Sequence, residues 1–528
     1  KDFSIRQPVA ARVDVGVNRN PKGYFFRKST MRIENWDFIL NGYVGSDNYI
    51  DLIVTSSNID ISRARNYIPA KYSEFASEFR PAGNLSLVYK VKGISSRRVD
   101  PNYNLTVSLK NGHIARVRSG LNIDRLSFDG YYSNGSKNSR ATSSITISNF
   151  KSKFGSANYK GSFSITDFTR PSAVLDLKGP LYPAELKEFF NLRNIARTEG
   201  SIGIDINLSG PLEKKNKYTL SDIFGLNSRS EFSFNSFGIK LADKPVDLKS
   251  VSGKIIVAGS TSARDFRFNL NGQEIIMDCD LQNLSEWLAG FPVSLNGTAS
   301  INASSIKPES FFGGSEAKAE SSVKKAPLVL PDAVNLEVSF KIGSFIYKKF
   351  SAEKINGNLS LKPKIVNVRS LSLSSQEGKV TGNGLVVQHA DKSFTGRGSF
   401  SVSGIDINKT FKSFSNFSQN FLKADNLAGS LSGLLTLILP VDSMLNPKMK
   451  SLTAEGKFVL IKGSLINFDP VKALSRFIEL SELENIKFDK LENDFFIRDN
   501  HFYLPQMDIK SSAVDLSVNG EHSFDNEY

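Results

Sequence analysis

Cysteine is almost absent from this sequence: one, Cys279, occurs in 528 residues. A disulfide within the chain is therefore excluded, and the fold must be held by packing and hydrogen bonding. The segment 275–281 around Cys279 predicts a strand, so we interpret this residue as a small strand residue rather than a reactive thiol. Long apolar runs are missing too. Without about 18 consecutive apolar residues, the sequence predicts no helix that spans a membrane.

The residues that enzymes concentrate at their sites are also scarce. The sequence has no Gly-x-Ser-x-Gly motif, no phosphate loop, and no pair of carboxylates that can be assigned as acid and base. We expect the glycine-rich segments 378–384 and 396–398 to be turns. The four histidines, expected in structural or surface roles, lie at no metal-ligand spacing: His113, His389, His501 (beside a hairpin turn) and His522. The sequence predicts a protein that is not an enzyme, with no catalytic residue, cofactor or metal site.

Positive charge predominates, but it is not concentrated in a binding site. The chain carries 67 Lys+Arg against 53 Asp+Glu, a formal net charge of +14. The basic residues are spread along the chain, and none of their short clusters accompanies a recognisable nucleic-acid-binding module. We therefore expect no nucleic-acid partner. Weak attraction to an anionic membrane surface fits such a diffuse charge better.

Apolar residues that alternate with polar ones are abundant. Hydrophobic residues make up 40% of the chain, with 39 Phe and 15 Tyr, as is typical of a folded protein. The segment Gly200–Gly210 places four aliphatic side chains on one face and polar ones on the other, which predicts a strand with one dry face. The same period of two recurs around Leu85, Leu295, Leu431 and Leu516. One wet face in strand after strand favours antiparallel meanders.

Helix-like stretches and turn signals separate these strands. Residues 67–79, 183–190, 284–288 and 411–421 predict short helices, the last with Phe411, Phe414, Phe417 and Phe421 at helical spacing. The strands that follow them are roughly 100–130 residues apart, which indicates a repeat of several strands plus one helix. Asn-Gly pairs at 111–112, 271–272 and 383–384 predict hairpin turns. Residues 307–327 are small and polar, and predict a flexible linker or loop.

The C-terminal third has a recognisable order of elements. Strand-like segments 427–439 and 454–468 precede a helix-like stretch, 470–483, and the strand-like segments 486–497, 503–512 and 515–520 follow it. In this order and spacing, residues 328–528 resemble the AsmA-like C-terminal region of the AsmA family, bacterial bridge-like lipid transfer proteins. Residues 1–306 resemble the family only in style, as β-groove repeats.

The resemblance implies an inner-membrane-anchored protein that faces the periplasm of a Gram-negative envelope. Members of the family are thought to form an elongated, curved antiparallel β-sheet with an apolar, taco-like groove, and to carry phospholipid in outer-membrane biogenesis. The implied partners are phospholipid or another envelope lipid, the inner membrane, and outer-membrane or envelope proteins. The family's N-terminal membrane anchor is missing from this chain, which opens at Lys1 without a signal peptide and suggests a segment of a longer protein.

Two architectures remain open from the residues alone. The predicted helices are too few to cover so much apolar sheet, so either two sheets cover each other as a sandwich or one curled sheet leaves an apolar trough. The resemblance favours the trough, and with it a non-enzymatic lipid conduit. A sandwich favours a structural or scaffolding protein that assists envelope or outer-membrane protein assembly. The side chains expected to line a trough are Leu85, Leu87, Val91, Ile202, Ile204, Ile206, Leu208, Leu431, Leu435, Leu437, Leu439, Val514, Leu516 and Val518.

Overall fold

The protein is mainly β, with few short helices. Its computed structural model describes residues 9–19, 21–33, 35–63, 77–117, 120–212, 226–242, 246–288, 290–311, 328–418, 422–472, 475, 479–513 and 515–523. The 27 strands of this described part belong to one open sheet, which is largely antiparallel. The predicted fold class is confirmed in these respects. Because every described strand lies in one sheet, the two-sheet sandwich is wrong.

The strands are long, and most are joined to the next strand in the chain. The first thirteen are β1 (Val9–Arg12), β2 (Val15–Arg19), β3 (Lys22–Ile33), β4 (Trp36–Gly45), β5 (Tyr49–Asp60), β6 (Phe79–Ile94), β7 (Asn102–Arg116), β8 (Asn122–Ser133), β9 (Ser144–Phe154), β10 (Ala157–Thr166), β11 (Ser172–Leu181), β12 (Ile195–Pro211) and β13 (Asn227–Leu241). The next seven are β14 (Asp247–Ala258), β15 (Ser260–Leu270), β16 (Gln273–Gln282), β17 (Leu295–Ile306), β18 (Val334–Tyr347), β19 (Phe350–Lys362) and β20 (Ile365–Ser375). The last seven are β21 (Gly378–Gln388), β22 (Phe394–Asp406), β23 (Leu427–Val441), β24 (Thr453–Ile466), β25 (Asn485–Arg498), β26 (His501–Ile509) and β27 (Leu516–Ser523).

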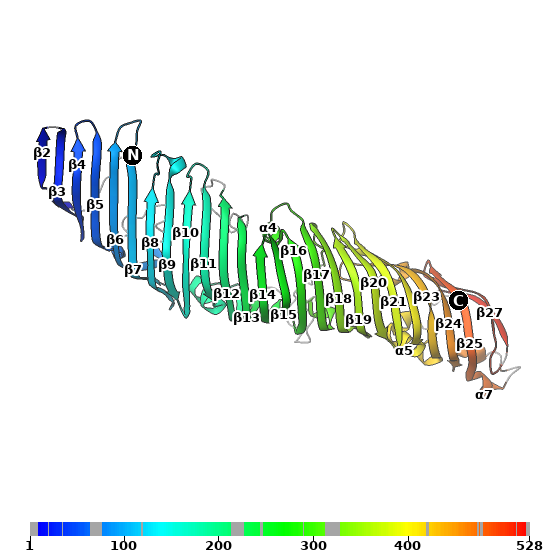
Figure 1. Ribbon diagram of the computed structural model, residues 1–528. Helices are drawn as coiled ribbons and strands as arrows, with labels where there is room; N and C mark the ends of the chain where they lie inside the picture. Colours follow the sequence, from blue (N-terminus) through cyan, green and yellow to red (C-terminus); the bar gives the residue numbers. More distant parts are fainter. Residues whose placement is uncertain are drawn as a thin grey trace. The chain divides into compact units, whose positions relative to one another are not determined.

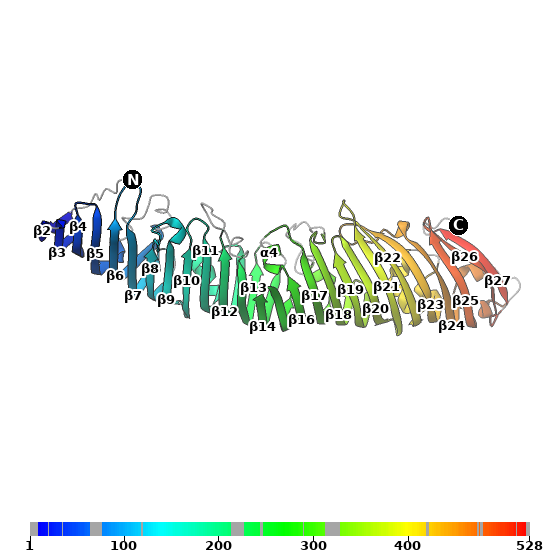
Figure 2. The same ribbon diagram turned by 45° about the horizontal axis from the view of Figure 1, so that its top comes forward.

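The chain forms two compact units. The N-terminal unit comprises residues 1–243, 249–261 and 285–291, and the C-terminal unit comprises residues 244–248, 262–284 and 292–528. Figures 1 and 2 show β2 to β12 side by side in chain order within the first unit, and β17 to β27 within the second. One described pairing is parallel, β17 with β18. The segment predicted as a linker, 307–327, falls between these two parallel strands in the sequence.

Five of the described helical segments bear on the predicted helices. The helix expected at 183–190 is confirmed as α2 (Pro183–Phe190), and that at 284–288 as α4 (Leu284–Leu288). Within the expected helix 470–483, the described residues form α6 (Asp469–Lys472) and α7 (Leu480–Leu483), and residues 473–474 and 476–478 lie outside the described part. At the linker, Pro308–Phe311 form a short 3-10 turn, η3, and residues 312–327 lie outside the described residues. Most of the stretch 67–79 also lies outside them, and Phe79 opens β6.

The phenylalanine helix predicted at 411–421 is wrong in its extent. The helix α5 (Ile407–Ser413) begins earlier, capped by the Asp406 side chain, and ends before Phe414. The next turn, η4 (Ser415–Ser418), contains Asn416 and Phe417 in the left-handed backbone region, with φ values of 54°. Phe421 lies outside the described residues. The helical spacing of these phenylalanines thus does not continue as one helix, because the backbone reverses its hand between them.

Two of the three Asn-Gly turns are also wrong. Asn271-Gly272 joins β15 to β16 as expected, with φ values of 52° and 86°. Asn111 (φ 52°) lies instead inside β7, at a bulge where the pairing with β6 and β8 shifts register. The Asn-Gly pair occurs both at the turn and at the bulge, because a bulge needs the same left-handed residue as a tight turn. Asn383-Gly384 lies within β21, paired with Ser399 and Gly398 of β22.

Candidate functional site

The apolar side chains of the N-terminal unit form continuous rows across its strands. Residues directly opposite each other in neighbouring strands share a face of the sheet. Starting from Leu87 of β6, one such row crosses seven strands through Val107, Gly130, Ile147, Phe163, Leu175 and Leu208. The register therefore brings Leu85, Leu87 and Val91 onto the same face as Ile202, Ile204, Ile206 and Leu208, although more than a hundred residues separate the two sets.

The C-terminal unit has an equivalent face. Leu435 lies opposite Phe400 of β22 and Gly456 of β24, and Leu437 lies opposite Gly398 and Ala454. Leu431 and Leu439 belong to the same alternation, and the register continues through β25 and β26 to Val518 of β27. Val514 lies outside the described residues, and the side chain of Leu516 is not described.

These predicted residues are not sealed in a core. Of the twelve whose side chains are described, only Ile204 is buried, at 6% exposed, and the other eleven are partly buried. The same holds for the large apolar residues generally. Five of the described phenylalanines are buried: Phe154, Phe189, Phe266, Phe394 and Phe488. Intermediate exposure is expected where side chains contact their neighbours within the sheet but no second layer covers them.

Short helices cover one end of each face. In the N-terminal unit, Phe189 of α2 is buried against Phe154 and Phe79, and Arg116 places its guanidinium over the Phe189 ring. In the C-terminal unit, Ile407 of α5 packs with three buried residues of the sheet, Leu427, Leu460 and Phe488, and Figure 1 shows α5 at one end of these strands. Leu431 and the partly buried Phe411 pack against this cluster. Leu431 thus packs beside the covered cluster, whereas Leu435, Leu437 and Leu439 are not part of this packing.

The C-terminal face is built from rings that lie over glycines. A Cβ atom on Gly398 would come within 2.5 Å of the Phe400 ring, and one on Gly463 within 2.1 Å of the Phe488 ring. Gly357 and Gly456 have the same relation to Phe340 and Phe495. The segments 378–384 and 396–398, predicted to be turns, are therefore strand interiors of β21 and β22. Two of their glycines, Gly382 and Gly398, leave room for the Phe400 ring, an arrangement known to stabilise strand glycines.

The N-terminal face carries tyrosines instead. The rings of Tyr89 and Tyr103 are stacked, with centroids 6.3 Å apart and planes 6° apart, and Tyr132 lies one strand further along the same rows. Burial raises the pKa of Tyr89 and of Tyr103, because the phenolate is less well solvated than the phenol. Burial also raises the pKa of Tyr159 to about 12. The Tyr159 hydroxyl donates a hydrogen bond to the Pro180 carbonyl at 2.7 Å.

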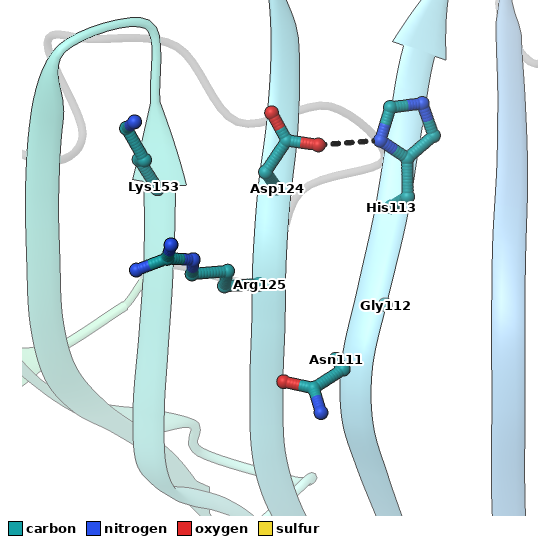
Figure 3. A pocket seen from close by; sticks show the side chains of 6 residues that line it. All are labelled: Asn111, Gly112, His113, Asp124, Arg125 and Lys153. Atoms are coloured by element: carbon teal, nitrogen blue, oxygen red, sulfur yellow. Dashed lines mark hydrogen bonds and ion pairs between the residues drawn. The ribbon is translucent and has the colours of Figure 1, made fainter.

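The opposite face is polar and holds a shallow pocket. Figure 3 shows this pocket, where the His113 ring and Asp124 meet with Nδ1 and Oδ1 2.6 Å apart, and Arg125 and Lys153 lie beside them. His113 thus lies at the surface, as expected, with its ring within hydrogen-bond distance of Asp124. No group of three His, Cys, Asp or Glu side chains in the described part of the chain could hold a metal ion. Among the same residues, no helix is long and apolar enough to cross a membrane.

The remaining single-residue predictions concern Cys279 and three histidines. His389 is exposed, with its Nε2 2.8 Å from the Thr395 hydroxyl, and His522 is partly buried in β27. Cys279 is buried in β16, and burial raises the pKa of its thiol, as fits a small strand residue. His501 opens β26 directly after the left-handed turn residues Asp499 and Asn500.

Comparison with known proteins adds no family to this picture. The chain matches no protein-family model, no curated protein and no solved structure. The function must therefore be argued from the sheet itself.

Proposed function

We propose that this protein is a non-enzymatic lipid conduit, along whose apolar face phospholipid moves between the membranes of a bacterial envelope. The observation that carries the proposal is the pair of long apolar faces, continuous through the strand register and only partly buried, in a sheet with no described facing layer. A soluble scaffold with a closed core would be expected to bury such side chains.

The energetics make such a face sufficient for transport without a catalytic group. Moving an acyl chain through water exposes its methylenes at about 0.8 kcal/mol each, so a sixteen-carbon tail costs on the order of 12 kcal/mol. A continuous apolar face lowers this barrier at every step. Bulges bend the strands that carry them, and a sheet that bends toward its apolar face forms a trough that can shield a tail from water.

The cellular setting of the proposal comes from the resemblance to the AsmA family. It places the protein in the periplasm, held to the inner membrane by an anchor outside this chain, and gives it a part in outer-membrane biogenesis. The diffuse net charge of +14 suits work near anionic lipid headgroups. Outer-membrane or envelope proteins are the partners that the resemblance implies.

The decisive experiment combines lipid detection with a blocked variant. Native mass spectrometry of the purified chain should detect bound phospholipid, and the chain should speed transfer of a labelled phospholipid between vesicles. The variant Ile206→Asp with Leu437→Asp should abolish transfer and remain folded, because both side chains are only partly buried. Ile204 is unsuitable, since it is buried and a charge there would unfold its surroundings.

A matched control uses the neighbouring residues of the opposite face. Asn207→Asp with Thr436→Asp adds the same charge to the same two strands, and should leave transfer unchanged. A lipid-free protein without transfer activity would overturn the conduit and leave the scaffold. Loss of folding in the Ile206→Asp, Leu437→Asp variant would likewise indicate a closed core.

A further inference from the structure

The tyrosines of the N-terminal face are concentrated near one end of its strands. Tyr103 is the second residue of β7, and Tyr132 is the last but one of β8. Tyr89 joins them through the register, because Tyr89 and Tyr132 both lie opposite Leu105. The three rings, defined here as the tyrosine triad, are partly buried on a face that is otherwise aliphatic and aromatic.

The hydroxyls of the triad are not used by the fold. None of them makes a hydrogen bond to any residue in the described part of the chain, although the hydroxyls of Tyr131 and Tyr159 do, to Asn104 and to Pro180. A phenylalanine would pack equally well at these three positions, and the C-terminal face uses phenylalanine in this way. The triad therefore presents three free phenolic donors at the edge of an apolar surface.

The opposite end of the same strands is covered by α2. Phe79 opens β6 and Phe154 closes β9, and both contact the buried Phe189 of α2. Between the two ends lie Leu85 and Leu87, paired with Leu109 and Val107. From Tyr103 to Leu109 the strand extends roughly 20 Å, at about 3.3 Å per residue. The face thus changes across its width from the tyrosine hydroxyls, through the leucine and valine rows, to the aromatic cluster covered by α2.

We infer that the tyrosine triad binds the polar part of a glycerophospholipid, its ester carbonyl or phosphate oxygens, while the tails lie on the leucine and valine rows toward α2. This inference rests on the proposed conduit. It adds a binding site at which the lipid has one fixed orientation. Tyrosine suits such a boundary, because its ring packs on hydrocarbon while its hydroxyl donates to an oxygen at the wet side. Both hydroxyls are protonated at neutral pH, as tyrosine hydroxyls ordinarily are, and can therefore donate.

Removing only the hydroxyls tests the inference. In the full chain, Tyr89→Phe, Tyr103→Phe and Tyr132→Phe are combined, and binding is titrated by fluorescence with two probes. One is phosphatidylglycerol with a pyrene-labelled acyl chain, and the other is a pyrene-labelled alkane of equal length. Phospholipid affinity should fall at least about tenfold, as the loss of several hydrogen bonds predicts. Alkane affinity should stay the same.

Matched controls and a competitor complete the design. Tyr131→Phe removes a hydroxyl from the opposite face of β8, and Tyr159→Phe removes one already bonded within the protein; neither should change the ratio of the two affinities. Glycerol 3-phosphate should compete poorly, because it lacks tails. Competition by glycerol 3-phosphate at concentrations like those of the lipid would mean a free-phosphate site and overturn the inference.

The other outcomes separate this inference from the proposed function. Unchanged phospholipid affinity in the triple variant, or equal loss with both probes, refutes headgroup recognition by the triad while the conduit stands. If the unaltered chain binds neither probe, the conduit itself fails, and the triad loses its ligand with it.

Discussion

The two units line their apolar faces differently. Both alternate apolar and polar residues along antiparallel strands, and both cover one end of the apolar face with a short helix, α2 or α5. The C-terminal unit then lays phenylalanine rings over strand glycines, within one strand as Phe400 does over Gly398, or across two strands as Phe488 does over Gly463. The N-terminal unit instead carries the tyrosine triad, whose rings have hydroxyls.

The difference shows that one strand pattern supports two kinds of surface. Rings that lie over glycines present hydrocarbon to the apolar face. Rings that carry hydroxyls make a face with an internal boundary between apolar and polar contacts. If lipid moves along both faces, the C-terminal face has no preferred position for the headgroup. The N-terminal face has a binding site for it at the tyrosine triad.

The largest expected effect separates covered from uncovered parts of the C-terminal face. Leu460 is 3% exposed in the cluster under α5, so Leu460→Ala should cost about 3 kcal/mol of unfolding free energy. Leu437→Ala, on the uncovered part, should cost only about 1 kcal/mol, since less surface is buried there. Urea unfolding followed by circular dichroism measures both. Equal costs would show that Leu437 is sealed like Leu460.

The next effect tests the ring-over-glycine arrangement. Gly398→Ala should destabilise by about 2 kcal/mol, because the new Cβ collides with the Phe400 ring. Gly396→Ala is the control two residues away in β22, where a Cβ would meet nothing closer than 3.7 Å; its change should stay within about 0.5 kcal/mol. Adding Phe400→Leu should rescue Gly398→Ala. Without such a rescue, the backbone rather than the ring would be the obstacle.

A smaller effect is expected on the stability of the N-terminal unit at alkaline pH. Burial raises the pKa of Tyr89, Tyr103 and Tyr159, the last to about 12, all in the N-terminal unit. Because the folded state holds these protons more tightly than the unfolded chain, whose tyrosine pKa is about 10, stability is full below pH 10 and falls as the pH rises toward 12. Tryptophan fluorescence reports on this unit, since both tryptophans, Trp36 and Trp287, belong to it. Tyr159→Phe should move the transition to higher pH.

The smallest effect is expected on the polar face. Lys490 and Lys457 lower the pKa of Glu492 to about 2. Its contribution to stability is therefore full above the ordinary value of 4.5 and is lost as the pH falls toward 2. Glu492→Gln should shift the urea midpoint less than Gly398→Ala does, and added salt should remove the shift, because the group is at the surface. A larger, salt-independent shift would mean that the polar face also holds the fold.

The sequence indicated the antiparallel sheet, the shared face of Ile202 to Leu208, and the helices at 183–190 and 284–288. These follow from local periods of two or 3.6, which a short segment contains in full. The bulge at Asn111 was read as a turn, because both need a left-handed residue. The glycines of β21 and β22 were predicted to be turns, because the local sequence does not show that Gly382 lies under the Phe400 ring of the next strand.

Only the tertiary structure decided which apolar side chains of the sheet are covered by a helix and which are exposed. Leu431 and Leu437 look alike in sequence, yet Leu431 packs against the cluster of α5 and Leu437 does not. Likewise, Tyr103 and Tyr159 differ only in whether a carbonyl is within reach of the hydroxyl. Alternation sets the face on which a side chain lies, because it is a property of one strand. Cover and hydrogen-bond partners depend on residues far away in the chain, and the fold alone brings those together.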